Sequence, residues 1–260
     1  MKRALITGAA TRLGRDMALY LAERGYDVAI HYHSSHDAAQ DTVAAITAKG
    51  QNACAIRADL LETGAAARVF NEARSHLGGD ITCLINNASV FEYDRIGMVT
   101  DEGFDRHLAS NLKAPLMLIQ EMAAQGLTAT PDAAGEPIAR GTVINMIDQR
   151  VRKLTPEFMS YTLAKSALWT LTQTAAQALA PHIRVNGIGP GPTVIGHRQS
   201  SAHFKGQREN TVLKRGSNPD DILAALGYFL DAPAVTGQLI CADGGQHLGW
   251  ETPDIRGVEL

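Results

Sequence analysis

Short apolar runs alternate along the chain with longer segments whose apolar residues recur at helical spacing. The short runs, which predict strands, cover residues 3–7, 26–31, 52–57, 82–86, 142–147, 182–187 and 238–242. The longer segments, which predict helices, cover residues 13–24, 37–49, 62–76, 101–125, 156–180 and 219–230. The strands show little apolar–polar alternation, which is typical of strands covered on both faces. The pattern therefore predicts an α/β fold with a doubly wound parallel sheet and helices on both of its faces.

Nothing in the pattern divides the chain, so we predict one domain over residues 1–260. Two long stretches have the composition of loops. One covers residues 126–141, and the other, expected to be irregular, covers residues 189–217 and is rich in Gly, Ser and basic residues. Loops of this length in compact domains are commonly lids or binding segments. The second loop is therefore a candidate substrate loop.

Composition excludes several classes of protein. The chain is 45% hydrophobic and 20% charged with a formal net charge of −3, so no basic footprint for nucleic acid or an anionic membrane exists. Its longest apolar stretch, residues 222–230, is too short to span a membrane. Cys54, Cys83 and Cys241 are scattered, which suits a reducing compartment. We expect a cytoplasmic protein without nucleic-acid or membrane partners.

A glycine turn lies between the first predicted strand and helix. Residues 4–14 read Ala-Leu-Ile-Thr-Gly-Ala-Ala-Thr-Arg-Leu-Gly, with Arg12 where a dinucleotide fingerprint has its middle glycine. Such a turn lets the backbone approach a pyrophosphate at the N-terminus of a helix. A tight turn that binds nothing is the alternative. The residues expected at the cofactor phosphates are Gly8, Arg12, Leu13 and Gly14.

The second predicted strand ends in hydroxyl and imidazole side chains. An NAD site places a carboxylate near this point to bind the ribose, but no acid precedes Asp37. We therefore expect NADPH rather than NADH. The alternative is that these side chains only form an exposed turn at the end of the strand. The expected contacts are His31, His33, Ser34 and Ser35. The histidines lack a flanking carboxylate or thiol cluster, so we predict no metal site.

Asp59 and Leu60 follow the third predicted strand. A carboxylate at this position can accept a hydrogen bond from the adenine amino group. The alternative is that Asp59 caps the next helix.

Tyr161 and Lys165 lie four residues apart on one predicted helix and so share a face. A nearby ammonium stabilises a phenolate, so we expect proton exchange at Tyr161 to move towards neutral pH. The same lysine could hold a nicotinamide ribose. The pair alone is a weak signal.

In context the pair is specific, because the sequence resembles the short-chain dehydrogenase/reductase family over nearly its full length. The motifs that carry the resemblance are residues 7–14, Asp59, Asn86-Asn87-Ala88-Ser89, Asn111, Tyr161 with Lys165, Arg184-Val185-Asn186, Pro190-Gly191 and Asp243-Gly244-Gly245. The resemblance implies a Rossmann-like sheet of about seven strands, a nicotinamide cofactor held by roughly residues 1–120, and a homo-oligomer, more often a tetramer than a dimer.

The same resemblance implies roles for individual residues. Asn87 and Ala88 would border the cofactor, and Asn111 would organise a proton-relay water. Pro190 and Gly191 would pass near the nicotinamide, and Thr193 could cover it.

One departure from the family pattern bears on the reaction. Ordinary members carry a serine 13 residues before the tyrosine, and here that residue is Asp148. A carboxylate opposes tyrosinate formation by like-charge repulsion, so the pair is better suited to passing a proton than to binding an oxyanion. Reduction of a C=N bond needs such a proton at the ring nitrogen. The alternative is an Asp148 turned to solvent in an inactive relative.

Further departures resemble the pteridine reductase branch, which includes bacterial dihydromonapterin reductases. They are Arg12, Ser89 in place of the usual glycine, and Phe91, together with His31-Tyr32-His33 and Asp148. In that branch Phe91 would stack on a pterin lying against the nicotinamide, and Arg12 and Ser89 would bind pterin and cofactor groups. Trypanosomatid-type relatives carry an arginine where residues 33–35 have none. Packing is the alternative role for Phe91.

Three functions are thus weighed. The favoured one is NADPH-dependent reduction of a pterin of the dihydromonapterin, dihydrobiopterin or dihydrofolate type, with Asp148, Tyr161, Lys165 and Asn111 as the catalytic residues. The second is oxidoreduction of a carbonyl or alcohol in a sugar, steroid or 3-oxoacyl substrate. The third is non-catalytic dinucleotide binding.

Overall fold

The protein folds around one seven-stranded parallel sheet. The computed structural model describes residues 2–196 and 199–252. The strand order is β3-β2-β1-β4-β7-β8-β9. The strands are β1 (Lys2–Ile6), β2 (Tyr26–Tyr32), β3 (Ala53–Arg57), β4 (Cys83–Asn86), β7 (Gly141–Met146), β8 (Ile183–Pro190) and β9 (Leu239–Ala242). This single-domain, Rossmann-like α/β architecture confirms the predicted fold class.

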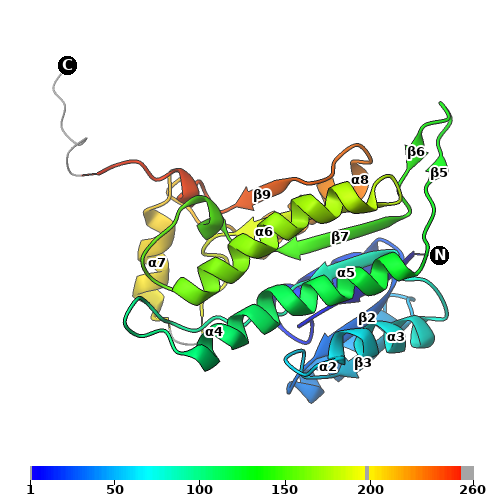
Figure 1. The fold of residues 1–260 in the computed structure, drawn as a ribbon, viewed down its shortest axis with the longest axis horizontal. Helices are drawn as coiled ribbons and strands as arrows, with labels where there is room; N and C mark the ends of the chain where they lie inside the picture. Colours follow the sequence, from blue (N-terminus) through cyan, green and yellow to red (C-terminus); the bar gives the residue numbers. More distant parts are fainter. Residues whose placement is uncertain (1, 197–198, 253–260) are drawn as a thin grey trace.

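Helices cover both faces of the sheet (Figure 1). One face packs against α1 (Arg12–Glu23), α2 (His36–Thr47) and α8 (Pro219–Asp231). The other packs against α3 (Ala65–Leu77), α5 (Ala114–Ala124) and α6 (Met159–Leu179). Every residue of β4 and β7 is buried, which explains why these strands show so little alternation in sequence.

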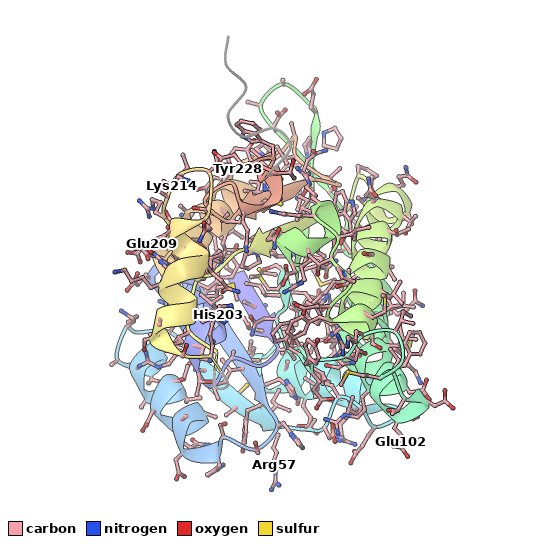
Figure 2. The ribbon with its side chains drawn as sticks, turned by 90° about the vertical axis from the view of Figure 1, so that its left-hand side faces the viewer. Arg57, Glu102, His203, Glu209, Lys214 and Tyr228 are labelled. Carbon is pink, nitrogen blue, oxygen red and sulfur yellow. The ribbon has the colours of Figure 1, made fainter. Side chains whose placement is uncertain are left out.

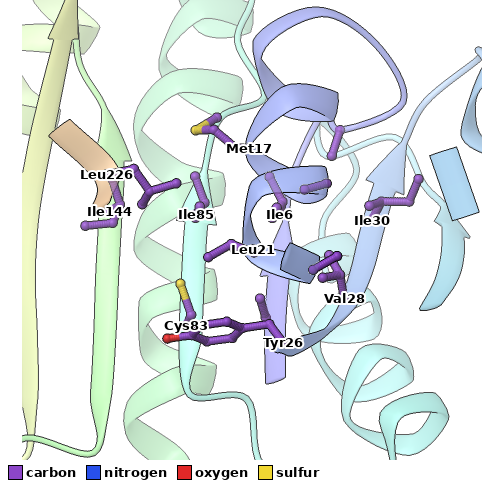
Figure 3. Close-up of a cluster of buried hydrophobic side chains, with 14 of the residues drawn as sticks. Ile6, Met17, Leu21, Tyr26, Val28, Ile30, Cys83, Ile85, Ile144 and Leu226 are labelled. Atoms are coloured by element: carbon purple, nitrogen blue, oxygen red, sulfur yellow. The ribbon is translucent and has the colours of Figure 1, made fainter. Parts of the chain in front are cut away.

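The core beneath α1 shows how the two halves of the sheet are joined. Ile6, Ile30, Ile85 and Ile144 come from four neighbouring strands and lie in one buried cluster with Leu21 of α1 (Figure 3). Each is fully buried. Burying a side chain of this size contributes about 1.5–3 kcal/mol. The cluster therefore fixes the sheet whose ends carry the loops discussed below.

The segment expected to be one helix over residues 101–125 is interrupted. It comprises α4 (Asp101–Leu108), a π-helical turn η1 (Ala109–Lys113) and α5. Such turns insert one extra residue per turn and occur often at functional sites. Helix α6 also begins later than expected, at Met159, because Phe158 adopts a left-handed backbone with φ 56°.

Both predicted loops contain short elements. Residues 126–141 include the hairpin of β5 (Thr130–Pro131) and β6 (Pro137–Ile138), which projects from one end of the molecule (Figure 1). The stretch 189–217, expected to be irregular, contains α7 (Ser201–Glu209), whose Ser200 side chain caps the helix by accepting from His203 N. Two 3₁₀ turns, η2 (Gln149–Arg152) and η3 (Gln246–Leu248), complete the fold. Residues 197–198 of the predicted substrate loop lie outside the described residues.

Candidate active site

The predicted site residues gather at the carboxyl edge of the sheet. In Figure 2 this edge faces the viewer, with α7, marked by His203, on one side and α4, marked by Glu102, on the other. The strand order reverses between β1 and β4, and ligands of open α/β sheets bind at such a switch point. Here the Asn87 amide nitrogen lies 2.9 Å from Thr7 O and 3.0 Å from Gly8 O, joining the segments that follow the two strands.

The turn after β1 is shaped to receive a phosphate. Gly8 has φ 64°, and a Cβ on Gly14 would lie 2.3 Å from Gly8 O, so only glycine lets α1 start this close to the turn. Thr11, the N-cap of α1, makes no side-chain capping bond, which leaves the first N–H groups of the helix to a ligand. These residues fit a dinucleotide pyrophosphate. Leu13 packs its side chain into the core below.

His31 lies beneath this turn rather than at its surface. It is 3% exposed; its Nδ1 accepts from Gly8 N at 3.2 Å, and its Nε2 lies 3.1 Å from Ala58 O. Both contacts require a neutral ring with the proton on Nε2. Burial lowers the pKa of His31 below its usual 6.5, which favours that form. His31 therefore supports the shape of the turn.

Arg12 keeps the backbone conformation that a glycine would have at its position. Its φ is 54°, in the left-handed region that costs an L-residue about 1–2 kcal/mol. Its guanidinium donates to Val194 O at 3.2 Å and so reaches across to the segment after β8. Strain of this kind collects at functional sites.

The ends of β2 and β3 form the region expected to hold the adenosine. His33 is largely exposed, with Nε2 3.8 Å from the Asp59 carboxylate. Asp59 also accepts from Leu61 N at 2.9 Å, so it orders its own turn, and α3 begins only at Ala65. The remaining predicted residues are placed as follows: Ser34 is exposed, Ser35 is the N-cap of α2 without a side-chain capping bond, and Leu60 packs against the core.

Arg57 is a residue of this region that the sequence reasoning missed. It ends β3, pairs in register with Tyr32 of β2, and its Nε lies 3.4 Å from His33 O. Figure 2 shows it extending outward at this corner of the molecule. It supplies the positive charge that residues 33–35 lack. The parallel register of two predicted strands was the signal that could have found it.

Asp148 and Tyr161 form a direct pair. The Tyr161 hydroxyl donates to Asp148 Oδ2 at 3.0 Å, and Asp148 Oδ1 accepts from Arg150 N at 2.8 Å. Asp148 follows β7 and is partly exposed, whereas Tyr161 is buried. Lys165 is 2% exposed, and its Nζ donates to Met146 O at 2.7 Å. The aspartate thus occupies the site and is not turned away from it.

The electrostatics correct one expectation. Burial raises the pKa of Tyr161 well above 10, and the Asp148 carboxyl raises it further, so the shift is away from neutral pH. Burial raises the pKa of Asp148 as well. Burial also lowers the pKa of Lys165 to about 8, although Asp148 opposes this shift. The arrangement favours neutral, proton-bearing groups over a phenolate.

The segment after β4 brings Ser89 and Phe91 beside Tyr161, and Asn111 binds its backbone. The Ser89 hydroxyl, 3.4 Å from Val90 O, is close enough to Tyr161 to offset part of the rise of the tyrosine pKa. The Phe91 ring lies edge-on to Tyr161 with centroids 4.7 Å apart, and it is 53% exposed. Asn111, in η1, bonds both polar groups of the Val90 backbone at 2.9 Å. Ala88 lies close to Gly8, since its Cα is 3.0 Å from where a Cβ of that glycine would be.

Phe158 and Asp94 were also missed by sequence reasoning. Phe158 stacks on Phe91 with centroids 4.5 Å apart and planes 5° apart, and the Arg150 guanidinium lies 4.7 Å from the centre of the Phe158 ring. The buried Asp94 accepts from Phe158 N and Ser160 N and so holds the start of α6. No local sequence pattern marks a left-handed phenylalanine.

The third side of the site follows β8. Gly191 N donates to Ala242 O at 3.1 Å, which ties the Pro190-Gly191 segment to β9. Thr193 is buried and bonds Gly191 O and the Ser217 hydroxyl. These residues lie at the end of the strand beside β7, which carries Asp148.

Comparison with known proteins assigns the fold to a family. A family model described as enoyl-(acyl carrier protein) reductase matches residues 8–247. The chain belongs to the short-chain dehydrogenase/reductase family. It is therefore an oxidoreductase of this family. Among relatives, it is 31% identical to 3-oxoacyl-[acyl-carrier-protein] reductase FabG of Staphylococcus epidermidis over 252 residues, which cover 95% of this chain and 99% of that protein.

Solved structures of this family are similar over almost the whole chain. FolM alternative dihydrofolate reductase 1 from Brucella suis, in complex with NADP, is 42% identical with a TM-score of 0.89 over 98% of each chain. The same protein from Brucella canis is 41% identical with a TM-score of 0.89, covering 98% of this chain and 97% of that one. A Burkholderia cenocepacia short-chain dehydrogenase in complex with NADP is 28% identical with a TM-score of 0.84, over 94% and 97%.

Two searches over residues 2–196 and 199–252 bear on other partners. No helix in that part of the chain is both long and apolar enough to cross a membrane. No group of three or more His, Cys, Asp or Glu side chains there is arranged to hold a metal ion.

Proposed function

We propose that this protein is an NADPH-dependent reductase of pterins of the dihydromonapterin, dihydrobiopterin or dihydrofolate type. The observation that carries the proposal is the Asp148–Tyr161 hydrogen bond of 3.0 Å between two groups whose pKa values are both raised. Carbonyl reduction needs an oxyanion to be steadied, whereas reduction of a ring C=N bond needs a proton at nitrogen. The pair is built for the second task.

NADPH is the cofactor that the site fits. The open N-terminus of α1 and the glycine turn suit its pyrophosphate, and His33 with Arg57 suits its 2′-phosphate. The related Brucella structures were solved with NADP, which supports this assignment. When bound, NADPH supplies a hydride from nicotinamide C4 to the carbon of the C=N bond.

The chain's own residues supply the matching proton. Tyr161 gives its hydroxyl proton to the ring nitrogen, and Asp148, in its neutral form, returns a proton to the tyrosine oxygen. Carbon gains a hydride and nitrogen gains a proton, so the bond is reduced without a further reductant. Lys165 would orient the ribose, and its ammonium lowers the pKa of Asp148 against the larger, opposite effect of burial. Asn111 holds the loop through the two bonds of its side chain to the Val90 backbone.

The substrate's flat ring would lie against Phe91. One face of that phenyl ring is covered by Phe158, so the heterocycle takes the other, between Phe91 and the nicotinamide. Ser89, in the segment after β4, and Arg12, at the start of α1, would offer hydroxyl and guanidinium groups to the pterin. The name of the 42%-identical Brucella suis relative, alternative dihydrofolate reductase, is consistent with a substrate of this class.

A second candidate rests on the FabG relative, at 31% identity over 95% of the chain. It is reduction of a ketone or a 3-oxoacyl group by the same hydride source. An ionised Asp148 would oppose the developing oxyanion by like-charge repulsion, whereas a neutral Asp148 could donate to it, so substrate turnover is what separates this candidate from the first.

The deciding experiment follows NADPH oxidation with dihydromonapterin, dihydrobiopterin, dihydrofolate and a panel of ketones, each repeated with NADH. We expect pterin turnover that prefers NADPH, and a loss in kcat of about 100-fold or more in Asp148→Ala, the scale of one general acid. Asp41→Ala, which removes an exposed carboxylate of α2, is the matched control. Ketone turnover without pterin turnover selects the second candidate. Unchanged pterin turnover in Asp148→Ala removes the proton relay.

A further inference from the structure

A buried histidine that the proposed chemistry does not use lies behind the Phe91 loop. His107, in the last turn of α4, is 1% exposed. Its Nδ1 lies 2.7 Å from Gly103 O, and its Nε2 lies 3.2 Å from Glu92 N. A carbonyl only accepts and an amide N–H only donates, so the ring carries its proton on Nδ1 and keeps a lone pair on Nε2. The two contacts fix one neutral tautomer.

Together with Asn111, His107 holds the backbone on both sides of Phe91. Asn111 lies four residues further along the same helical segment and binds the N–H and the carbonyl of Val90. His107 binds the N–H of Glu92. Val90 and Glu92 are the two chain neighbours of Phe91, so the ring projects from a backbone that is fixed before and after it.

The Phe91 ring, held in this way, is an exposed part of the site. Phe91 stacks on Phe158 and meets Tyr161 edge-on, while more than half of its surface remains open. The His107 ring itself lies 6.4 Å from the Tyr161 ring, centre to centre. An exposed aromatic on a free loop would lose rotational freedom on binding a ligand. Fixing its backbone beforehand removes part of that cost.

We infer that His107 is a positioning residue for substrate. Its Nε2 lone pair fixes Glu92 and thereby sets the plane of the Phe91 ring on which a flat heterocycle stacks. This inference rests on the proposed function for the identity of that heterocycle. The bracing itself rests on the bonds to Gly103 and Glu92 alone.

Two substitutions test the roles of the two ring nitrogens of His107 separately. His107→Asn places an amide where Nδ1 was and can still donate to Gly103, but it has nothing at the position of Nε2. His107→Gln places an amide oxygen where Nε2 was and can still accept from Glu92. We expect His107→Asn to raise the pterin KM about tenfold while kcat and the NADPH dissociation constant change less than about twofold. His107→Gln should restore most of the KM.

Hydrogen exchange gives a readout that needs no substrate. The peptide over residues 88–94 should exchange faster in His107→Asn than in the wild type or in His107→Gln. Nitrogen NMR of the wild type should show an unprotonated Nε2, which tests the tautomer even if a variant fails to fold. A protonated Nε2, or exchange and KM that are the same in both variants and the wild type, would overturn the inference.

The outcomes also separate this inference from the proposed function. If the wild type reduces ketones but no pterin, the proposed function fails, and His107 is judged by loop exchange and by the ketone KM. If both variants lose kcat, NADPH affinity and thermal stability together, His107 is a core residue without a role in positioning.

Discussion

Two short segments follow β1 and β4 at the carboxyl edge, and each is braced by one histidine and one asparagine. His31 and Asn87 bind the N–H and the carbonyl of Gly8, respectively. His107 and Asn111 bind the backbone on either side of Phe91. In both cases the histidine is buried and acts through a neutral ring.

The two segments differ in what they present to a ligand. The turn after β1 presents backbone N–H groups, braced from a strand, and these suit a pyrophosphate whatever the substrate is. The loop after β4 presents an exposed phenyl ring, braced from a helix. The comparison indicates that the proposed cofactor end depends on backbone shape, whereas the proposed substrate end depends on the identity of a few side chains.

The largest effect at the cofactor end is expected from Arg57→Gln. Removing the guanidinium beside His33 should weaken NADPH binding about tenfold, or about 1.4 kcal/mol, and leave NADH binding unchanged, because only NADPH carries the 2′-phosphate. Fluorescence titration of the cofactor measures both constants. Arg140→Gln, at the opposite edge of the sheet just before β7, is the control. Equal losses for NADPH and NADH would place the 2′-phosphate elsewhere.

Arg12→Gly tests whether the strained backbone of Arg12 is kept because its side chain binds substrate. Glycine relieves the left-handed backbone, so we expect the free energy of unfolding in urea to rise by up to about 1 kcal/mol, while the pterin KM rises several-fold. Lys214→Gly is the control for backbone strain alone, since Lys214 has φ 55° and, although it belongs to the candidate substrate loop, is assigned to no cofactor or substrate contact. It should gain stability without a change in KM. A stable, fully active Arg12→Gly would remove Arg12 from the substrate site.

The smallest effect concerns pH. The pKa of His31 is lowered in the folded protein, so below about pH 6.5 the unfolded state binds more protons, and stability falls as pH falls towards the folded pKa. Protonated Nδ1 would also face Gly8 N–H as a second donor. We expect NADPH affinity to drop a few-fold between pH 7.5 and 5.5, and less in His31→Asn, whose amide oxygen keeps the acceptor. An identical pH profile in the variant would contradict this.

Much of the architecture follows from local pattern. The strands were predictable because burial on both faces leaves continuous apolar runs, as in β7. The glycine turn and the four-residue spacing of Tyr161 and Lys165 were also predictable, because each is a local pattern whose geometry suits one chemical task. The proximity of Asp148 to Tyr161 and its opposition to a tyrosinate were predictable from the family's spacing, but the full rise of the tyrosine pKa was not. Its main cause is burial, which arises from contacts between distant segments.

The residues that escaped prediction depend on tertiary structure. Arg57 reaches His33 only through the pairing of β3 with β2. His107 reads in sequence as one more residue on a helix, and its role requires the loop after β4 to lie against that helix. Phe158 adopts a left-handed backbone conformation that its residue type disfavours. The bond from its N–H to Asp94 O, which forms only in the folded chain, holds it there.

The π-helical turn η1 sets how far α4 is rotated relative to α5 about the axis of what would otherwise be one helix. An α-helix advances about 100° per residue, so one added residue rotates everything on one side of the turn by about that angle relative to the other. Deleting a single residue from Ala109–Lys113 would straighten the segment into a continuous α-helix. With α5 anchored in the core, His107 would swing away from the loop that it binds. The length of one turn thus determines which face of α4 meets the loop after β4.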